Sequence, residues 1–470
     1  MDERIIQHIA SIVGEEHVKT SRAHLLAYSY DATANFQRMP ELVVSPANTE
    51  QVAEVVKICN EERIPIIPRG SGTNLAAGTV PYDGGVVFLF NRMSDIVDFD
   101  KENLTITVQP GIISERVCQF VEAEGLFYPP DPSSMRISTI GGNVSENSGG
   151  LRGLKYGVTK DYVKGLKVVL ANGEILETGG KLAKDVAGYD LTSLFIGAEG
   201  TLGIITEITL KLIPLPQSKM TSLAYFNSLE DAARTVSAII ANKIIPATLE
   251  FLDKKTIQAV EQFMKMGLPT DVEAMLLMEQ DGHATEVEQD VKEMVRIAKE
   301  HGATYTALAN DEAEADQLKT ARRVALSALA KLKPTVILED ATVPRSALAE
   351  MVTKINDIAE RYDVNIATFG HAGDGNLHPT CLTDVRDAEE MHRVEAAFEE
   401  IFEAAIQLGG TITGEHGVGE MKSPYLEWKI GPVGIQTMKL IKQSFDPNNI
   451  LNPGKVFAKE TKKRLVIQGG

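Results

Sequence analysis

The sequence has few of the features that mark secreted, membrane-spanning or nucleic-acid-binding proteins. Its 470 residues include three cysteines, Cys59, Cys118 and Cys381, an odd number that does not support a disulfide framework. It has no apolar run of about 18 residues, and its first residues lack the basic and apolar regions of a signal peptide. We therefore expect a cytoplasmic protein with no membrane span.

Positive charge is also scarce. Lysine and arginine total 47 against 65 aspartates and glutamates, which gives a net charge of -18. A polyanion would be repelled, so we expect no nucleic-acid partner. The length predicts two or three domains, and 43% hydrophobic residues are ordinary for a globular protein.

Chemically active residues gather in two short stretches. Residues 370–379 read Gly-His-Ala-Gly-Asp-Gly-Asn-Leu-His-Pro, and residues 414–417 read Gly-Glu-His-Gly. Asp374-Gly375 predicts a two-residue hairpin turn, which would place His371 directly opposite His378. Residues opposed in this way have Cβ atoms about 5 Å apart, close enough for both imidazoles to reach one ion.

A carboxylate would complete a metal site, and Glu415 is the candidate. Two histidines and one glutamate make a three-ligand site with an open position, as in catalytic metal centres. His416 would then be available for proton transfer. The alternative is that these histidines are ordinary structural residues, and a slip of one residue would put His371 and His378 on opposite faces.

Three glycine-rich segments occur in the first half of the chain, at residues 69–78, 139–150 and 197–203. Such segments offer backbone N–H groups without side-chain obstruction, which suits phosphate oxygens. The first begins Gly70-Ser71-Gly72 but has Leu75 where a dinucleotide fingerprint needs its third glycine. Three such segments favour a large polar cofactor over simple surface turns.

Strands and helices are predicted throughout, with a boundary at residues 214–216, Pro-Leu-Pro. Before the boundary we expect strands at 42–44, 64–68, 86–90, 104–108 and 204–212, and helices at 49–60 and 114–124. After it we expect helices at 228–243, 346–362 and 387–408, and strands at 275–278, 366–369 and 411–413. The order predicts an α+β protein.

The chain resembles the flavin-dependent 2-hydroxy-acid dehydrogenases of the vanillyl-alcohol oxidase (PCMH-type) superfamily, the group that includes glycolate oxidase flavin subunits and D-lactate dehydrogenases. The resemblance spans almost the full length and is most specific at residues 371–378 and 414–419. It implies a two-part FAD-binding domain at 1–215, with its core from about residue 39. It further implies a ferredoxin-like substrate domain at 216–430 and a C-terminal helical segment at 431–470 that returns to the flavin.

The resemblance also assigns roles to residues. FAD would be non-covalent, because Thr73 stands where tethering relatives carry a histidine. His371, His378 and Glu415 would bind zinc or manganese, and His416 would be the catalytic base. Arg322 would bind the substrate carboxylate, with Arg323 as its rival, because many relatives have tryptophan at the position of Lys319. The expected FAD contacts are Pro68, Arg69, Gly70, Ser71, Gly72, Thr73, Asn74, Pro132, Ser133, Thr139, Gly141, Gly142, Asn143, Ser148, Gly149, Tyr156, Gly157, Gly200, Ile205 and Asn452.

The implied activity is oxidation of a small anionic hydroxy acid, glycolate or D-lactate, to the 2-oxo acid. The resemblance implies an iron-sulfur partner subunit leading to quinone, which would hold the chain peripherally at the inner membrane, and it leaves a homodimer open. One alternative is a non-catalytic flavin subunit that relays electrons, and another is a metal hydrolase without flavin. An intact Glu415-His416 pair argues against the first, and the glycine segments argue against the second.

Overall fold

The computed structural model describes residues 1–82, 84–459 and 461–462, so the end of the predicted C-terminal segment, 463–470, lies outside the described residues. The chain divides into two compact units. The first unit contains residues 1–148, 158–215 and 415–462. The second unit contains residues 149–157 and 216–414. The first unit is therefore assembled from stretches that are distant in sequence.

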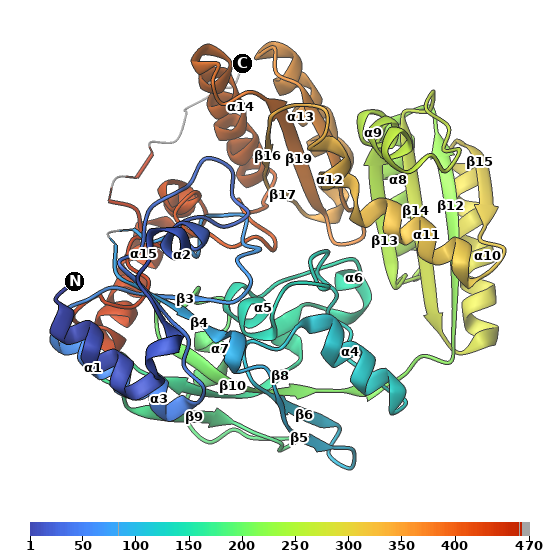
Figure 1. The fold of residues 1–470 in the computed structure, drawn as a ribbon. Helices are drawn as coiled ribbons and strands as arrows, with labels where there is room; N and C mark the ends of the chain where they lie inside the picture. Colours follow the sequence, from blue (N-terminus) through green and yellow to red (C-terminus); the bar gives the residue numbers. More distant parts are fainter. Residues whose placement is uncertain (83, 460, 463–470) are drawn as a thin grey trace. The chain divides into compact units, whose positions relative to one another are not determined.

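The first unit contains two main sheets (Figure 1). The smaller has the order β1-β2-β4-β3, and β2, β4 and β3 run parallel. Apolar residues from this sheet and from two neighbouring helices form its core. The elements are β1 (Val18–Lys19), β2 (Leu42–Val44), β3 (Ile66–Arg69), β4 (Val86–Leu89), α1 (Glu3–Val13), α2 (Arg22–Ala27) and α3 (Thr49–Glu61).

The larger sheet of this unit is antiparallel, with the order β5-β6-β10-β8-β9. Its strands are β5 (Ile96–Asp100), β6 (Thr105–Val108), β8 (Val163–Val169), β9 (Ile175–Gly179) and β10 (Ile204–Lys211). A two-stranded pair, β7 (Leu126–Phe127) and β11 (Ile213–Pro214), and the helices α4 (Ser114–Ala123), α5 (Ile140–Glu146) and α7 (Leu191–Phe195) complete this part.

The C-terminal stretch extends the small sheet. After α15 (Leu426–Phe445), which is broken at Gly431, the chain runs beside β3. The Ile66 amide donates to the Ile450 carbonyl at 2.7 Å, and the Asn452 amide donates to the Ile66 carbonyl at 2.8 Å. Ile450 and Leu451 are buried in the core of this sheet.

The second unit is built on one eight-stranded antiparallel sheet (Figure 1). Its order is β15-β12-β14-β13-β18-β19-β16, with β17 paired to β19. The first four strands, with α8 (Leu229–Ala241) and α10 (Ala284–Glu300) as crossovers, have the order of a ferredoxin-like fold. The strands are β12 (Ser218–Phe226), β13 (Thr248–Asp253), β14 (Ala274–Gly282), β15 (Ala303–Leu308), β16 (Thr335–Leu338), β17 (Ala341–Thr342), β18 (Ile366–His371) and β19 (Asn376–Thr383).

Helices of this unit fall into two groups. In one group, α8 packs against α10 and α13. In the other group, α9, α11 and α12 pack against one another. The helices are α6 (Gly153–Tyr156), α8 (Leu229–Ala241), α9 (Lys254–Met264), α10 (Ala284–Glu300), α11 (Glu312–Arg323), α12 (Ala325–Leu329), α13 (Leu348–Arg361) and α14 (Ala388–Gln407). In the part of the chain that the structure describes, no helix is both long and apolar enough to cross a bilayer.

Most predicted elements form near their expected bounds, but two expectations are wrong. The segment 139–150, expected as a glycine-rich loop, contains the helix α5, capped by the Thr139 hydroxyl, which accepts from the Gly142 amide. Residues 411–413, expected as a strand, make one isolated bridge, between Thr411 and Thr342. The glycine content of residues 139–150 made the helix difficult to predict. Residues 411–413 do not form a strand because their pairing is limited to the one bridge.

Candidate active site

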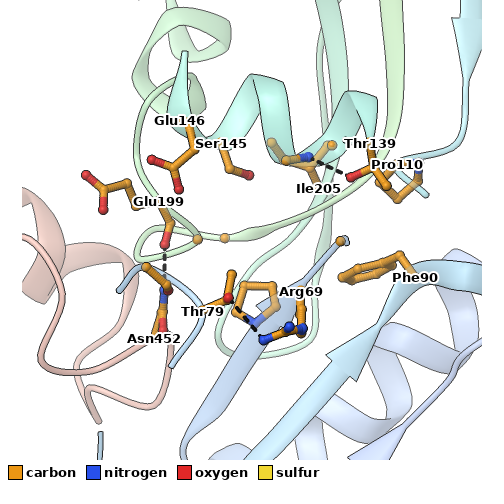
Figure 2. A pocket seen from close by; sticks show the side chains of 17 residues that line it. Arg69, Thr79, Phe90, Pro110, Thr139, Ser145, Glu146, Glu199, Ile205 and Asn452 are labelled. Carbon is orange, nitrogen blue, oxygen red and sulfur yellow. Dashed lines mark hydrogen bonds between the residues drawn. The ribbon is translucent and has the colours of Figure 1, made fainter. Parts of the chain in front are cut away.

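A pocket in the first unit gathers the glycine-rich segments (Figure 2). It lies where β3 ends, where α5 begins and where the segment 197–203 precedes β10. Its lining residues are Pro68, Arg69, Gly70, Gly78, Thr79, Phe90, Pro110, Thr139, Gly141, Gly142, Ser145, Glu146, Glu199, Gly200, Gly203, Ile205 and Asn452.

Glycine is required where these segments meet. A Cβ atom on Gly70 would lie 2.2 Å from the Thr139 hydroxyl oxygen. Gly200 has a φ of +69°, and a Cβ there would lie 2.4 Å from Cγ of Pro68. Backbone therefore replaces side chain on several sides of the pocket, which fits a ligand with phosphate groups.

Nine of the expected FAD contacts line this pocket: Pro68, Arg69, Gly70, Thr139, Gly141, Gly142, Gly200, Ile205 and Asn452. Ser71, Gly72, Thr73, Asn74, Pro132, Ser133, Asn143 and Ser148 belong to the same unit without lining it. Gly149, Tyr156 and Gly157 group with the second unit, where the Tyr156 hydroxyl donates to Asp281 at 2.8 Å.

Two polar side chains hold the pocket's shape. The side-chain nitrogen of Asn452, Nδ2, donates to the backbone carbonyls of Gly78 and Glu199, at 2.9 and 2.8 Å. The Arg69 guanidinium donates to the Tyr30 carbonyl at 2.7 Å and to the Thr79 hydroxyl at 3.3 Å (Figure 2). These contacts join three sequence-distant loops around one space.

Two of the lining residues, Glu146 and Glu199, are acidic. Glu199 accepts hydrogen bonds from the amides of Val418 and Gly419, at 2.7 and 2.6 Å. Glu146 accepts from the Asn74 side chain at 2.7 Å, and its other oxygen, Oε2, is buried without a hydrogen-bond partner among the described residues. Burial, followed by the charge of Glu199, raises the pKa of Glu146 well above its usual value.

The histidine hairpin lies in the second unit, with a different register from the expected one. His371 is opposite Asn376, not His378, so Ala372–Gly375 form a four-residue connection. The error is two residues, and side chains alternate with a period of two, so both histidines still point to the same face. Their ring centroids are 5.1 Å apart, and both residues are buried.

Each histidine has its own carboxylate. Nδ1 of His371 lies 2.8 Å from Glu250, and Nδ1 of His378 lies 3.0 Å from Asp340. A carboxylate at Nδ1 favours a proton on that nitrogen, which leaves Nε2 with its lone pair. Histidines that bind metals usually donate the N–H of their other ring nitrogen to a carboxylate in this way. The two Nε2 atoms of this hairpin therefore fit a divalent ion as ligands.

Asp340 also holds residues 413–414, the segment of the second unit that directly precedes Glu415. Its second oxygen accepts from the Thr413 hydroxyl at 3.0 Å and from the Gly414 amide at 3.1 Å. Glu415 and His416 follow directly in the chain and group with the first unit, where the His416 Nε2 lies 3.7 Å from the Glu415 carboxylate.

Of the two candidate arginines, Arg322 is the buried one. Its side chain is 2% exposed, its Nε lies 2.6 Å from Glu250, and its guanidinium lies over the Phe369 ring at 4.7 Å. Arg323 is only partly buried. Lys319, one turn earlier on α11, is also buried and pairs with Glu279 at 2.9 Å.

Glu250, Asp340, Glu146 and Glu199 were not predicted as site residues from the sequence. One available signal was a carboxylate inside an apolar strand, since Glu250 lies within Thr-Leu-Glu-Phe-Leu-Asp of β13. Such a residue is almost never buried without a partner. Phe90 and Pro110, which also line the pocket, carry no comparable signal.

Comparison with known proteins agrees with these features. Residues 40–179 match the family model "FAD binding domain", and residues 215–456 match "FAD linked oxidases, C-terminal domain". The chain is 61% identical over 462 residues to the glycolate oxidase subunit GlcD of Bacillus subtilis (strain 168), with 98% of each chain covered. It is 39% identical to a D-lactate dehydrogenase of Anaerostipes hadrus, with 92% of this chain and 93% of the relative covered.

Solved structures share the fold at lower identity. A p-cresol methylhydroxylase with substrate bound has a TM-score of 0.81 at 20% identity and covers 97% of this chain and 96% of its own. An alkyldihydroxyacetonephosphate synthase has a TM-score of 0.76 at 18% identity and covers 96% of this chain and 86% of its own. With the two family models and the close relatives, this likeness shows that the chain is an oxidoreductase of the FAD-linked oxidase family, with a PCMH-type FAD-binding domain.

Proposed function

We propose that this chain oxidises a small 2-hydroxy acid, glycolate or D-lactate, to the corresponding 2-oxo acid with FAD as the electron acceptor. The supporting relatives are named glycolate oxidase subunit and D-lactate dehydrogenase. The observation that carries the proposal in this chain is the pair of buried histidines, each bonded to a carboxylate at Nδ1, on one face of the hairpin.

The glycine-lined pocket of the first unit would hold the FAD. When bound, FAD supplies a hydride acceptor at its N5 atom. Pro68, Gly70, Thr139 and Gly200 would approach it through backbone and small side chains. Thr73 cannot form the histidyl link of tethered flavoproteins, so we expect the cofactor to be released intact by denaturation.

His371, His378 and Glu415 would be the metal ligands. A divalent ion, zinc or manganese, would supply polarisation of the substrate's 2-hydroxyl group. The two imidazoles offer Nε2 because Nδ1 is engaged by Glu250 and Asp340. Asp340 holds the Gly414 amide, and Glu415 is the next residue in the chain.

His416 would accept the hydroxyl proton, and Arg322 would bind the substrate carboxylate. A guanidinium meets a carboxylate with two parallel hydrogen bonds, which fixes the orientation of the acid. The substrate would give this proton to His416, and its C2 hydride would be accepted by the flavin. Arg322 is favoured over Arg323 because its buried guanidinium lies on the same sheet face as the histidines.

A partner subunit would take the electrons onward. The relatives named as subunits suggest an assembly, and an iron-sulfur protein leading to quinone suits this step. The three cysteines of this chain are fewer than the four thiolates that usually hold an iron-sulfur cluster, so they do not offer a cluster site of their own.

The test is an anaerobic absorbance titration of the purified flavoprotein with glycolate, D-lactate, L-lactate and D-2-hydroxyglutarate. Bleaching of the oxidised flavin bands by glycolate or D-lactate is the expected result. His416→Ala should keep bound flavin and bleach about 10² to 10⁴ times more slowly. A yellow protein that no hydroxy acid bleaches would overturn the proposal and favour an electron-relay subunit.

A further inference from the structure

Glu250 is a fully buried carboxylate with two different basic partners. It lies in the middle of β13 with no exposed surface. Its Oε1 is 2.8 Å from Nδ1 of His371, and its Oε2 is 2.6 Å from Nε of Arg322. One side chain therefore touches both the histidine of the metal hairpin and the arginine of the candidate substrate site.

The fold imposes this arrangement. Glu250 and His371 are directly opposed across β13 and β18, so their side chains emerge side by side. Arg322 comes from the last turn of α11, and its guanidinium lies over the Phe369 ring of β18. Three elements thus converge on one carboxylate.

The charges match the geometry. A buried carboxylate is retained at such a position only when it is paired. Nε and Nη2 of Arg322 are both buried, and neither makes a hydrogen bond among the described residues, so the contact with Glu250 is an ion pair and these N–H groups remain available to an anion.

We propose that Glu250 is a positioning residue that holds His371 for metal binding and Arg322 for carboxylate binding at the same time. The inference rests on the proposed function, because it assigns a common support to its two binding sites. Glu250 does not touch the substrate. It fixes which nitrogen of His371 is free and which edge of the guanidinium is presented. One substitution should therefore weaken both metal binding and substrate binding.

Glu279 provides a matched control. It is a buried glutamate of the neighbouring strand β14, and it points to the same sheet face, since Leu277 is the residue opposite Glu250. Its partners are Lys319 at 2.9 Å and the Thr221 hydroxyl at 2.7 Å, and neither is a histidine. A general cost of neutralising a buried glutamate in this sheet would appear in both variants.

The experiment measures the affinity of the FAD-loaded protein for Zn²⁺ and Mn²⁺ by competition with a chromophoric chelator, together with KM and kcat. We expect Glu250→Gln to weaken metal binding about 10- to 100-fold and to raise KM for the acid. Glu279→Gln should change metal affinity less than about twofold, within ordinary context effects. Glu250→Asp, which keeps the charge but shortens the reach, should show the same double loss if Glu250→Gln does not fold.

The outcomes separate the two proposals. Equal metal affinity in wild type, Glu250→Gln and Glu279→Gln, with stoichiometric metal bound, would overturn the role of Glu250 and leave the metal site intact. The His378→Ala variant removes a proposed metal ligand and serves as the metal-free reference. If the wild-type protein binds no more metal than this variant, both the metal site and this inference would be overturned.

Discussion

Glu146 shows what the flavin pocket costs the apoprotein at the scale of one residue. Its Oε2 is buried with no hydrogen-bond partner in the part of the chain that the structure describes, and burial with the charge of Glu199 raises its pKa. In the unfolded chain this carboxyl ionises near its usual pKa of about 4.3. The folded chain thus binds the proton more tightly, and its stability falls as pH rises from that value through the raised folded pKa.

We therefore predict that Glu146→Gln stabilises the apoprotein at neutral pH, by about 1 to 3 kcal/mol, and has little effect near pH 4. The single tryptophan, Trp428 on α15, belongs to the first unit, so its fluorescence during urea unfolding reports this unit. The pH dependence of the difference between variant and wild type is the decisive quantity. A difference that does not change between acid and neutral pH would show that the carboxyl ionises normally in the fold.

Glu420, in the same unit, offers the opposite case. Burial would raise its pKa, but hydrogen bonds and charges from Arg38 and Lys455 hold that pKa below its usual value. Its contribution to stability is present above the unfolded pKa and is lost as the pH falls. Glu420→Gln should accordingly destabilise at neutral pH, which makes it the control for Glu146→Gln.

At the scale of elements, the connection between β18 and β19 depends on one glycine. Gly375 has a φ of +82°, and a Cβ there would lie 2.1 Å from the Val343 carbonyl oxygen. Gly267 has the same φ of +82°, but nothing lies within 4 Å of its Cβ position. The two positions share the conformational requirement and differ in steric contact.

We predict that Gly267→Ala costs about 1 kcal/mol, the price of a left-handed conformation. Gly375→Ala should cost a further 1 to 3 kcal/mol, about the penalty for overpacking, and should also disturb the His371 and His378 pair. Denaturation followed by circular dichroism measures both losses, and metal affinity should fall only in Gly375→Ala. Equal losses in the two variants would mean that the Val343 contact relaxes freely.

This hairpin also shows how far the sequence could predict the site. The turn residues predicted a hairpin with His371 and His378 on one face, and the hairpin and the shared face are both correct. The register was wrong because a four-residue connection replaces the two-residue turn. Glu250 and Asp340 could not be assigned to their histidines, because pairing of β13 with β18 and the position of Asp340 depend on long-range folding that local patterns do not specify.

At the scale of the whole molecule, the first unit depends on residues from the end of the chain. Ile450 and Leu451 are in its core, the Ile450 carbonyl accepts from β3, and Asn452 joins two pocket loops. The amides of Val418 and Gly419 satisfy Glu199. A fragment of residues 1–215 would lose all of these contacts.

We predict that this fragment aggregates or fails to retain flavin, and that co-expression with residues 415–462 restores flavin binding. Size-exclusion chromatography with flavin absorbance distinguishes the two states. The matched control is residues 216–414, which contain the complete eight-stranded sheet. A monomeric, yellow fragment of residues 1–215 would show that the C-terminal stretch is dispensable.

The discontinuity of the first unit also sets an order of events during synthesis. Domains generally fold as they leave the ribosome. Residues 216–414 emerge while the first unit still lacks its C-terminal stretch, so the sheet that carries the histidine hairpin can fold first. The flavin pocket can close only after Asn452 has been translated, so we expect cofactor insertion to follow the synthesis of the second unit.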